Sequence, residues 1–278
     1  MSKPIRVALS GSGFKFPAHV GALKAILQAD FLPIEIAATS GGSIIAALYA
    51  AGMPIDEMEQ LALHHDWTDM MSFNPWALLT KMGYCNGNAL HEWLADNTYD
   101  RTFADLNISL TIVASDITYM RPYIFSGVMT PNVPLAFAAR CSASIPFAYA
   151  PMPCSGCLLV DGGVRNNIPI DLLVDDHVPQ IGVQLVSNIP PLKPGAHGVV
   201  EILRRIVESM MSANESAHVD LGVRDGAMMA FVETGYVDGL DRNMSLADRQ
   251  RLMDDAYIKT AAALVTPIKS LQNVLVSV

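Results

Sequence analysis

A serine in the setting of a nucleophile follows the second apolar run of the sequence. Residues 34–38 are mostly apolar and end at Thr39-Ser40-Gly41-Gly42, after which small and apolar residues have the spacing of a buried helix. A strand, a sharp turn and a helix in this order hold a serine hydroxyl at the strand tip, in a strained turn whose neighbours must be small. We interpret Ser40 as a nucleophile and Gly42 as support for its turn. A tight strand-to-helix connection of any α/β fold has the same pattern.

A second pattern lies upstream, where a glycine-rich stretch separates a predicted strand at 5–9 from a predicted helix at 18–29. The backbone N–H groups of such a turn, together with the helix N-terminus, form an anion site. A dinucleotide-binding fingerprint would need a third glycine where Phe16 stands, and a phosphate-binding P-loop would need a Gly-Lys-Ser/Thr that is absent. Nucleotide binding is therefore the weaker interpretation of this stretch.

The stronger interpretation is an oxyanion hole, in which backbone N–H groups stabilise the charge on a carbonyl oxygen attacked by Ser40. The residues that would supply these groups are Gly11, Ser12, Gly13 and Phe14. Lys15 would add positive charge beside the turn, or would simply be solvated. A glycine turn that serves only to allow positive φ angles is the alternative without a function.

A nucleophilic serine needs a base, and an aspartate could act as that base without a histidine. Asp161 follows the apolar run Leu158–Val160 and precedes Gly162 and Gly163, whose lack of side chains would let the backbone pack close to Ser40. A free aspartate has a pKa of about 3.9. Asp161 would therefore need desolvation to raise its pKa and an oxyanion hole to lower most of the barrier.

A Ser-His-Asp triad in the chain order of α/β-hydrolases is the alternative. The acid would be Asp116 or Asp161, and the base would be one of three downstream histidines, His177, His197 or His218. None of these histidines stands at a strand end within a glycine or turn constellation. The sequence therefore favours a Ser40–Asp161 dyad, and the triad stays open.

The order of elements predicts how these residues are brought together. Helix follows strand twice near the start of the chain, which favours a parallel sheet with crossover helices. Ligands of such sheets bind at the carboxyl ends of the strands, where Ser40 and Asp161 are both expected. We predict an α/β fold, a three-layer α/β/α sandwich with a mostly parallel central sheet.

The chain is expected to form one domain over residues 1–278, with a core at about 5–190 and a helical extension at about 196–278. The segment 67–82 is too apolar for a solvated loop, with tryptophan, methionine and phenylalanine side chains spaced along it. Such a segment packs as a second layer, or forms a flap over an acyl groove, because methionine and aromatic side chains adapt to acyl chains.

The composition and charge of the chain exclude some classes of function. The chain has 278 residues, of which 51% are hydrophobic and 16% charged, and its net charge is −9. This argues against disorder and against nucleic acid as a partner, and gives no electrostatic help on anionic membranes. Neither a signal peptide nor a membrane-spanning run is recognisable, and four cysteines are too few for a disulfide scaffold. We expect a cytoplasmic protein that contacts a membrane only transiently.

Taken together, these stretches resemble the patatin-like phospholipases. Leu9–Lys15 is similar to the family's glycine-rich oxyanion motif, and Ala38–Ser43 is similar to its nucleophile elbow. Arg140–Pro146 resembles the serine-rich segment before the last core strands, and Asp161–Pro169 resembles the motif of the catalytic aspartate. Each motif alone is weak, but their occurrence in this order over residues 5–190 is specific.

The resemblance implies a lipid acyl hydrolase that cleaves acyl esters of phospholipids or lysophospholipids, with no metal and no other cofactor. It assigns the nucleophile to Ser40, the base to Asp161 and the oxyanion donors to residues 11–14. It also implies that the partner of the protein is a lipid or phospholipid substrate, with peripheral contact to a membrane.

Two positions depart from the family pattern. Phe16 stands where the family commonly has glycine, right after the basic residue, and is expected to crowd the oxyanion loop. Ala38 replaces the first glycine of the elbow, where we expect strain without loss of the turn. Both changes keep open a second class of function, a weakly active or inactive lipid-binding relative. Nucleotide binding at the glycine loop is the third class.

Overall fold

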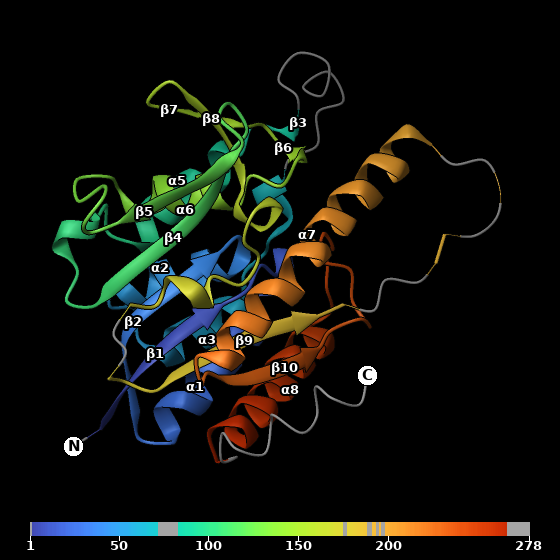
Figure 1. Ribbon diagram of the computed structural model, residues 1–278. Helices are drawn as coiled ribbons and strands as arrows, with labels where there is room; N and C mark the ends of the chain where they lie inside the picture. The colour runs from blue at the N-terminus through green and yellow to red at the C-terminus, as the bar shows by residue number, and fades with distance from the viewer. Residues whose placement is uncertain are drawn as a thin grey trace.

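The computed structural model describes residues 2–71, 83–174, 177–187, 191–192, 195 and 198–265 (Figure 1). Most of the apolar segment predicted to form a second layer or a flap lies outside these residues, and so does His197. The part of that segment that is described contains Trp67 and Met70, and both side chains are buried in the core.

The main sheet has a parallel part and an antiparallel part. The parallel strands are β10 (Met228–Glu233), β9 (Gln180–Val186), β1 (Lys3–Leu9), β2 (Phe31–Thr39) and β4 (Ser109–Asp116). The antiparallel strands are β5 (Arg121–Ser126), β7 (Met152–Cys154) and β8 (Cys157–Asp161). Hydrogen-bonded neighbours follow one another as β10-β9-β1-β2-β4-β8-β7, with β5 also paired to β4, and β2 and β8 pair with successive stretches of β4. Strands β3 (Gly83–Cys85) and β6 (Phe147–Tyr149) form a separate pair.

The alternation of side chains along the central strands creates two covered faces. On one face, Val7 and Leu9 join the large core cluster, and on the other, Ala8 and Ala37 join a small cluster with Val219. The first face carries α1 (Pro17–Gln28), α2 (Gly41–Ala50), α3 (Ile55–His64) and α8 (Leu246–Val265). Helices α5 (Asn88–Asn97) and α6 (Leu135–Ser142) pack together beside α2, and α7 (Val199–Arg224) crosses the opposite face (Figure 1). The predicted α/β sandwich is confirmed.

The sheet extends further along the chain than the sequence indicated. The segment after residue 196 was expected to be helical, and α7 and α8 are, but β10 lies between them and pairs with β9 as a parallel strand at the edge of the main sheet. The first residues of β10 are all buried, so this short apolar run lacks the alternation of buried and exposed positions that is typical of a strand. Its sequence pattern therefore does not distinguish it from a helix.

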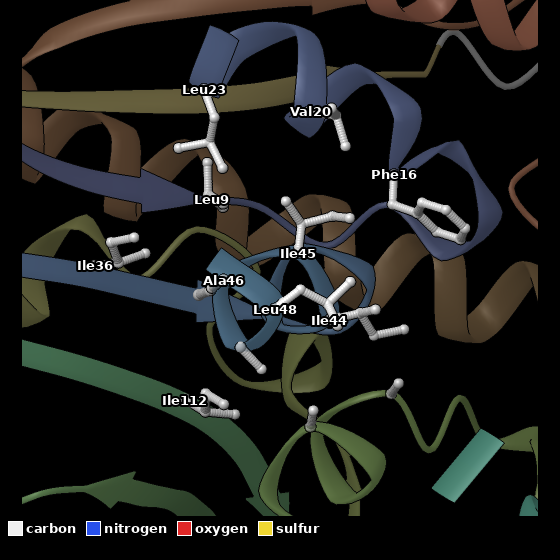
Figure 2. Close-up of a cluster of buried hydrophobic side chains, with 14 of the residues drawn as sticks. Leu9, Phe16, Val20, Leu23, Ile36, Ile44, Ile45, Ala46, Leu48 and Ile112 are labelled. Atoms are coloured by element: carbon white, nitrogen blue, oxygen red, sulfur yellow. The ribbon is translucent and has the colours of Figure 1, made fainter. Parts of the chain in front are cut away.

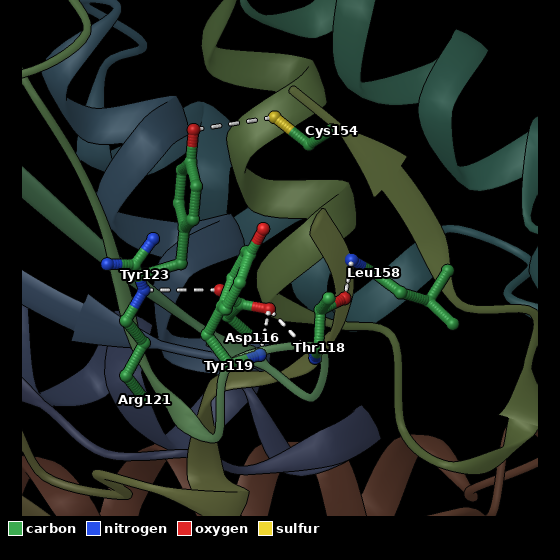
Figure 3. A network of polar contacts seen from close by, with 7 residues as sticks. All are labelled: Asp116, Thr118, Tyr119, Arg121, Tyr123, Cys154 and Leu158. Atoms are coloured by element: carbon green, nitrogen blue, oxygen red, sulfur yellow. Dashed lines mark hydrogen bonds and ion pairs between the residues drawn. The ribbon is translucent and has the colours of Figure 1, made fainter. Parts of the chain in front are cut away.

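The antiparallel strand β8 is a correction to the expected sheet. We expected its carboxyl end to lie at the same edge as those of the parallel strands, but β8 runs against β4. The turn after β4 helps to hold it there, because the Asp116 carboxylate accepts hydrogen bonds from the Thr118 and Tyr119 amides at 2.9 and 3.2 Å, and the Thr118 hydroxyl accepts one from the Leu158 amide at 2.8 Å (Figure 3).

The apolar core holds the two helices that flank the predicted functional turns. Figure 2 shows Leu23 of α1 and Ile45 of α2 packed with Leu9, Ile36 and other side chains of the sheet. On its outer side α1 lies against α8, and a Cβ added at Gly21 would come within 2.0 Å of the Met253 carbonyl oxygen. The contact between the two helices is therefore as close as backbone atoms allow.

This close contact predicts that Gly21→Ala is destabilising. Overpacking of this kind costs about 1–3 kcal/mol of the free energy of unfolding, and chemical denaturation would measure it. The control is Gly198→Ala, because a Cβ added at Gly198 meets nothing within 4 Å. If Gly21→Ala and Gly198→Ala had the same denaturation midpoint, the close packing of α1 against α8 would be contradicted.

Candidate active site

The turn at Ser40 has the strained geometry that the sequence indicates. Ser40 has φ 52° and ψ −129° and is 1% exposed. A Cβ added at Gly41 would lie 2.2 Å from the Ser12 hydroxyl oxygen, and one added at Gly42 would lie 2.4 Å from the Ser10 carbonyl oxygen. Both positions after the serine therefore require glycine. Ala38 is fully buried within β2, where its small side chain is accommodated.

Ser40 and Asp161 are in direct contact. The Ser40 hydroxyl donates a hydrogen bond to Asp161 Oδ2 at 2.6 Å, and the Gly163 amide donates to Oδ1 at 2.8 Å. Asp161 is fully buried at the end of β8, where the helical turn η4 (Gly162–Val164) begins. Both oxygens of the carboxylate are thus hydrogen-bonded, one of them to the predicted nucleophile.

The register of the strands explains this contact. A strand has two edges, and β5 occupies one edge of β4 along 111–116. On the other edge, β2 pairs with 109–113 and β8 with 114–116, so the two strands lie end to end. Because they run in opposite directions, their carboxyl ends meet, with Thr39 opposite Val113 and Asp161 opposite Ala114.

Burial gives Asp161 the properties of a base. Desolvation raises the pKa of its carboxyl group from 3.8 to about 7, although the hydrogen bonds from Ser40 and Gly163 act in the opposite direction. A carboxylate with this pKa accepts a proton far more readily than an ordinary aspartate, and is still ionised in about half of the molecules at neutral pH.

The serine-rich segment at the end of α6 holds both residues against the sheet. The Ser142 hydroxyl donates to the Val113 carbonyl at 2.5 Å and accepts from the Ser40 amide at 2.8 Å. The Ser144 carbonyl accepts from the Asp161 amide at 2.9 Å, and the Ser144 hydroxyl accepts from buried Arg140 at 2.5 Å. The sequence indicated this segment only through its resemblance, because these contacts join residues far apart in the chain.

The glycine-rich loop uses two of its four predicted donor amides inside the protein. The Gly11 amide donates to the Asn167 carbonyl at 2.9 Å, and the Phe14 amide donates to the Gly239 carbonyl at 2.8 Å. Within the described part of the chain, the amides of Ser12 and Gly13 have no hydrogen-bond partner. The loop therefore offers two N–H groups beside Ser40.

The side chains of Lys15 and Phe16 are both buried, in different surroundings. The Lys15 ammonium donates to the hydroxyls of Ser187 and Thr234, the second at 3.0 Å, and these residues directly follow β9 and β10. The ring of Phe16 packs edge-on against Trp67, with 4.7 Å between centroids. The expected crowding of the loop by Phe16 is absent, because its ring enters the core (Figure 2).

The histidines have other contacts. His218 on α7 lies 3.0 Å from Asp171, and His19 contacts the Ser10 carbonyl at 2.8 Å. Full burial lowers the pKa of His19 to about 4, so it is a neutral support of the glycine loop. Asp116 is held in the β4–β5 turn and pairs with Arg121 at 3.2 Å (Figure 3). No hydrogen bond joins Ser40 to a histidine among the residues that the structure describes.

A cavity of about 460 Å³ lies in front of Ser40. One part is polar and includes the glycine loop, Lys15, Asn167 and Glu215. The remainder is largely apolar and is lined by Ile145, Pro146, Phe147, Ala148, Leu185, Val207, Met211, Val237 and Leu240. An apolar cavity with a few convergent polar groups is typical of a site for a small or chain-like ligand.

The described residues contain no group of three or more His, Cys, Asp or Glu side chains that could hold a metal ion. No helix within them has the length and the apolar character needed to cross a membrane.

A serine elbow, a glycine loop and a buried aspartate on an α/β sandwich define the class of patatin-like phospholipases, and the model of that family matches residues 7–174. The chain belongs to the patatin-like phospholipase family, whose members are lipid hydrolases.

Two relatives show how far the similarity reaches. A protein of Acanthamoeba polyphaga mimivirus is 35% identical over 194 residues, which cover 66% of this chain and 65% of that protein. YqhO of Bacillus subtilis is 30% identical over 236 residues, which cover 76% of this chain and 81% of YqhO.

The solved structure of VipD from Legionella pneumophila has the same fold. It aligns over 95% of this chain and 66% of its own with a TM-score of 0.64 and 15% identity. The chain thus spans slightly less than two thirds of VipD and of the mimivirus protein.

The burial of Asp161 predicts an effect of pH on stability. The pKa of its carboxyl group is about 7 in the folded protein against 3.8 in the unfolded chain, so the folded state holds the proton more tightly and loses stability as pH rises through this window. An asparagine does not titrate. We expect Asp161→Asn to melt at a higher temperature than the wild type at pH 8, with the difference shrinking toward pH 5.

Thermal melts at several pH values test this expectation. Asp220→Asn, at an exposed position on α7, is the control for the loss of one negative charge. The raised pKa would be contradicted if the melting temperature of the wild type, measured relative to those of the two variants, were the same at pH 8 as at pH 5.

Proposed function

We propose that the protein hydrolyses acyl esters of phospholipids or lysophospholipids, with Ser40 as the nucleophile and Asp161 as its base. The observation that carries the proposal is the hydrogen bond of 2.6 Å from the Ser40 hydroxyl to a fully buried carboxylate. A serine hydroxyl beside a base of suitable pKa is the arrangement of covalent acyl transfer.

In the first half of the reaction, Ser40 Oγ attacks the acyl carbonyl carbon and its proton passes to Asp161 Oδ2. The negative charge develops on the carbonyl oxygen, and the amides of Ser12 and Gly13 are the donors proposed for it. The amide of Gly41, the residue after the nucleophile, is a third candidate, which the sequence analysis did not name. Collapse of the tetrahedral intermediate transfers the proton from Asp161 to the leaving alcohol and leaves an acyl-enzyme.

In the second half, water attacks the acyl-enzyme and gives one proton to Asp161. The new tetrahedral intermediate collapses, the proton returns to Ser40 Oγ, and the fatty acid leaves. The base is the same group in both halves, so a histidine is not needed for proton transfer.

The cavity supports an acyl chain as the group bound next to Ser40. Its apolar wall comes from β6, β9 and α7, whose side chains include Phe147, Leu185 and Met211. The outer half of α7, which extends beyond the sheet in Figure 1, exposes Ile202 and Ile206. These side chains suit the transient contact with a lipid surface that we propose for substrate entry.

Site-directed variants test the dyad. We expect Ser40→Ala and Asp161→Asn to lower kcat for a short-chain ester and for a phospholipid by about 10³-fold or more, because one removes the nucleophile and the other its base. His177→Ala, His197→Ala and His218→Ala are expected to keep most of the activity.

Three outcomes would favour a different function or mechanism. If a histidine variant were as inactive as Ser40→Ala, the Ser-His-Asp triad would replace the dyad. A wild type that turns over no ester but binds lipid vesicles would be a lipid-binding relative, and failure of a serine-directed phosphonate to label Ser40 would agree with that. A thermal shift with nucleotide would favour nucleotide binding at the glycine loop.

The pKa of Asp161 predicts the pH dependence of hydrolysis. Only the ionised carboxylate accepts the serine proton, so kcat/KM for a soluble ester is expected to rise with pH and to level off above an apparent pKa of about 7. Initial rates between pH 5 and 9 would measure it. A profile that is flat from pH 5 upward would show that the base is an ordinary, solvated carboxylate.

A further inference from the structure

Helix α7 lies beyond the segment matched by the family model, which ends at residue 174, and one of its faces rests on the segment that follows Asp161. The methyl carbon of Met211 lies 2.6 Å from the position of a Cβ added at Gly163, and Gly222 lies against Ile170. Between them, His218 contacts Asp171 at 3.0 Å. Met211, Glu215, His218 and Gly222 are spaced four, three and four residues apart, which places them on one side of the helix.

Glu215, in the middle of this face, accepts two side-chain amides. Its Oε1 accepts a hydrogen bond from Asn167 Nδ2, and its Oε2 accepts one from Gln184 Nε2 at 3.0 Å. Burial raises the pKa of the Glu215 carboxyl group, while the two amides and the charge of Lys15 act in the opposite direction. A partly buried carboxylate is thus held between one amide of the segment after Asp161 and one amide of β9.

Asn167 connects Glu215 to the glycine-rich loop. Its backbone carbonyl accepts the Gly11 amide at 2.9 Å. Its side-chain oxygen faces the same residue, because a Cβ added at Gly11 would lie 2.2 Å from Asn167 Oδ1. An ionised carboxylate only accepts hydrogen bonds, so Glu215 requires Asn167 to turn its NH2 group toward α7 and its oxygen toward Gly11.

We propose that Glu215 is a positioning residue of the hydrolytic site, acting through Asn167 on the Gly11–Gly13 loop. This inference rests on the proposed function. The Asn167 backbone carbonyl holds the Gly11 amide and Asn167 Oδ1 packs against Gly11, so the amides of Ser12 and Gly13 are fixed next to Ser40, where the oxyanion forms. Without Glu215, the Asn167 side chain is free to rotate, its oxygen leaves Gly11, and the loop relaxes although the backbone hydrogen bond remains. The substrate still binds in the cavity, but the donors no longer match the transition state.

Kinetics of Glu215→Ala and Glu215→Gln on a soluble short-chain ester test the proposal. We expect kcat of Glu215→Ala to fall about tenfold to a hundredfold with little change in KM, the effect of donors misplaced by about an ångström. Glu215→Gln keeps one acceptor oxygen and is expected to recover part of the loss. Ser216→Ala, at the next, exposed position of α7, is the control and is expected to match the wild type.

A double-mutant cycle with Asn167→Ala tests the route of the effect. If Glu215 acts through Asn167, the double variant is no slower than Asn167→Ala alone. If the two losses multiply, Glu215 acts by another route and the proposal fails.

Inhibition by a trifluoromethyl ketone carrying an acyl chain separates positioning from general structure. Ser40 adds to its carbonyl to give a hemiketal oxyanion, so its Ki is expected to rise by the same factor by which kcat/KM falls. The Kd of a long-chain alcohol, which is uncharged and forms no oxyanion, stays unchanged. An alcohol Kd that weakens in parallel would mean that the cavity itself has collapsed and would overturn the proposal.

Two controls keep the result interpretable. Thermal melts establish that each variant is folded, and the Glu215→Gln variant carries the test if Glu215→Ala does not fold. Loss of activity in Ser40→Ala together with wild-type kinetics in both Glu215 variants would overturn the positioning role and leave the hydrolase intact. Full activity in Ser40→Ala would overturn the proposed function itself.

Discussion

The contact between Ser40 and Asp161 depends on two strands that meet end to end beside β4. If β8 continued past Asp161 as a strand, it would collide with β2, and if β2 continued past Thr39 it would collide with β8. Both chains must therefore leave the sheet at the same point. Strand β2 turns into α2 and β8 turns into η4, so the serine and the aspartate are left facing each other. Here the close approach results from an antiparallel strand that takes over an edge of β4 from a parallel one.

This junction is costly, and the surrounding structure offsets the cost. A buried carboxylate and a serine with positive φ each cost free energy, and the local hydrogen bond from the Gly163 amide offsets only part of the cost for Asp161. Around them lie fully buried strands, the helices α1 and α2, and glycines that let the backbone approach closely. The rigid core holds the junction in place. The strained turn at Ser40 and the buried carboxylate of Asp161 therefore persist where the proposed chemistry needs them.

The sequence predicted what is local and missed what is long-range. The elbow at Ser40, the glycine-rich loop and the aspartate turn are short patterns in which each residue constrains its neighbours, and all three have the expected turns in the structure. The direction of β8 and the presence of β10 depend on pairings between segments far apart. Lys15 shows the same limit, since its type suggested charge near the loop, whereas its burial and its hydroxyl partners after β9 and β10 depend on segments far along the chain.

The support of the site follows the same rule. Ser142, Ser144 and Asn167 act on the site through backbone groups or through another side chain, so residue type and spacing gave no sign of their contacts. Glu215 lies some fifty residues after Asp161, on a helix whose sequence pattern indicated only that one of its sides packs against the protein. Such residues become visible once topology brings the helix face and the catalytic segment together.

Desolvation links the substrate to the base. Asp161 has the raised pKa expected of a base because water is excluded from it, and Met211 of α7 provides part of that exclusion on the side of Gly163. Under the proposed function, a ligand that entered the cavity with its hydration shell would lower the pKa of the carboxyl group and weaken the base. An acyl chain enters without water and adds apolar surface where the cavity is open. A lipid is therefore the kind of substrate that would leave the proposed dyad in the state in which it can act.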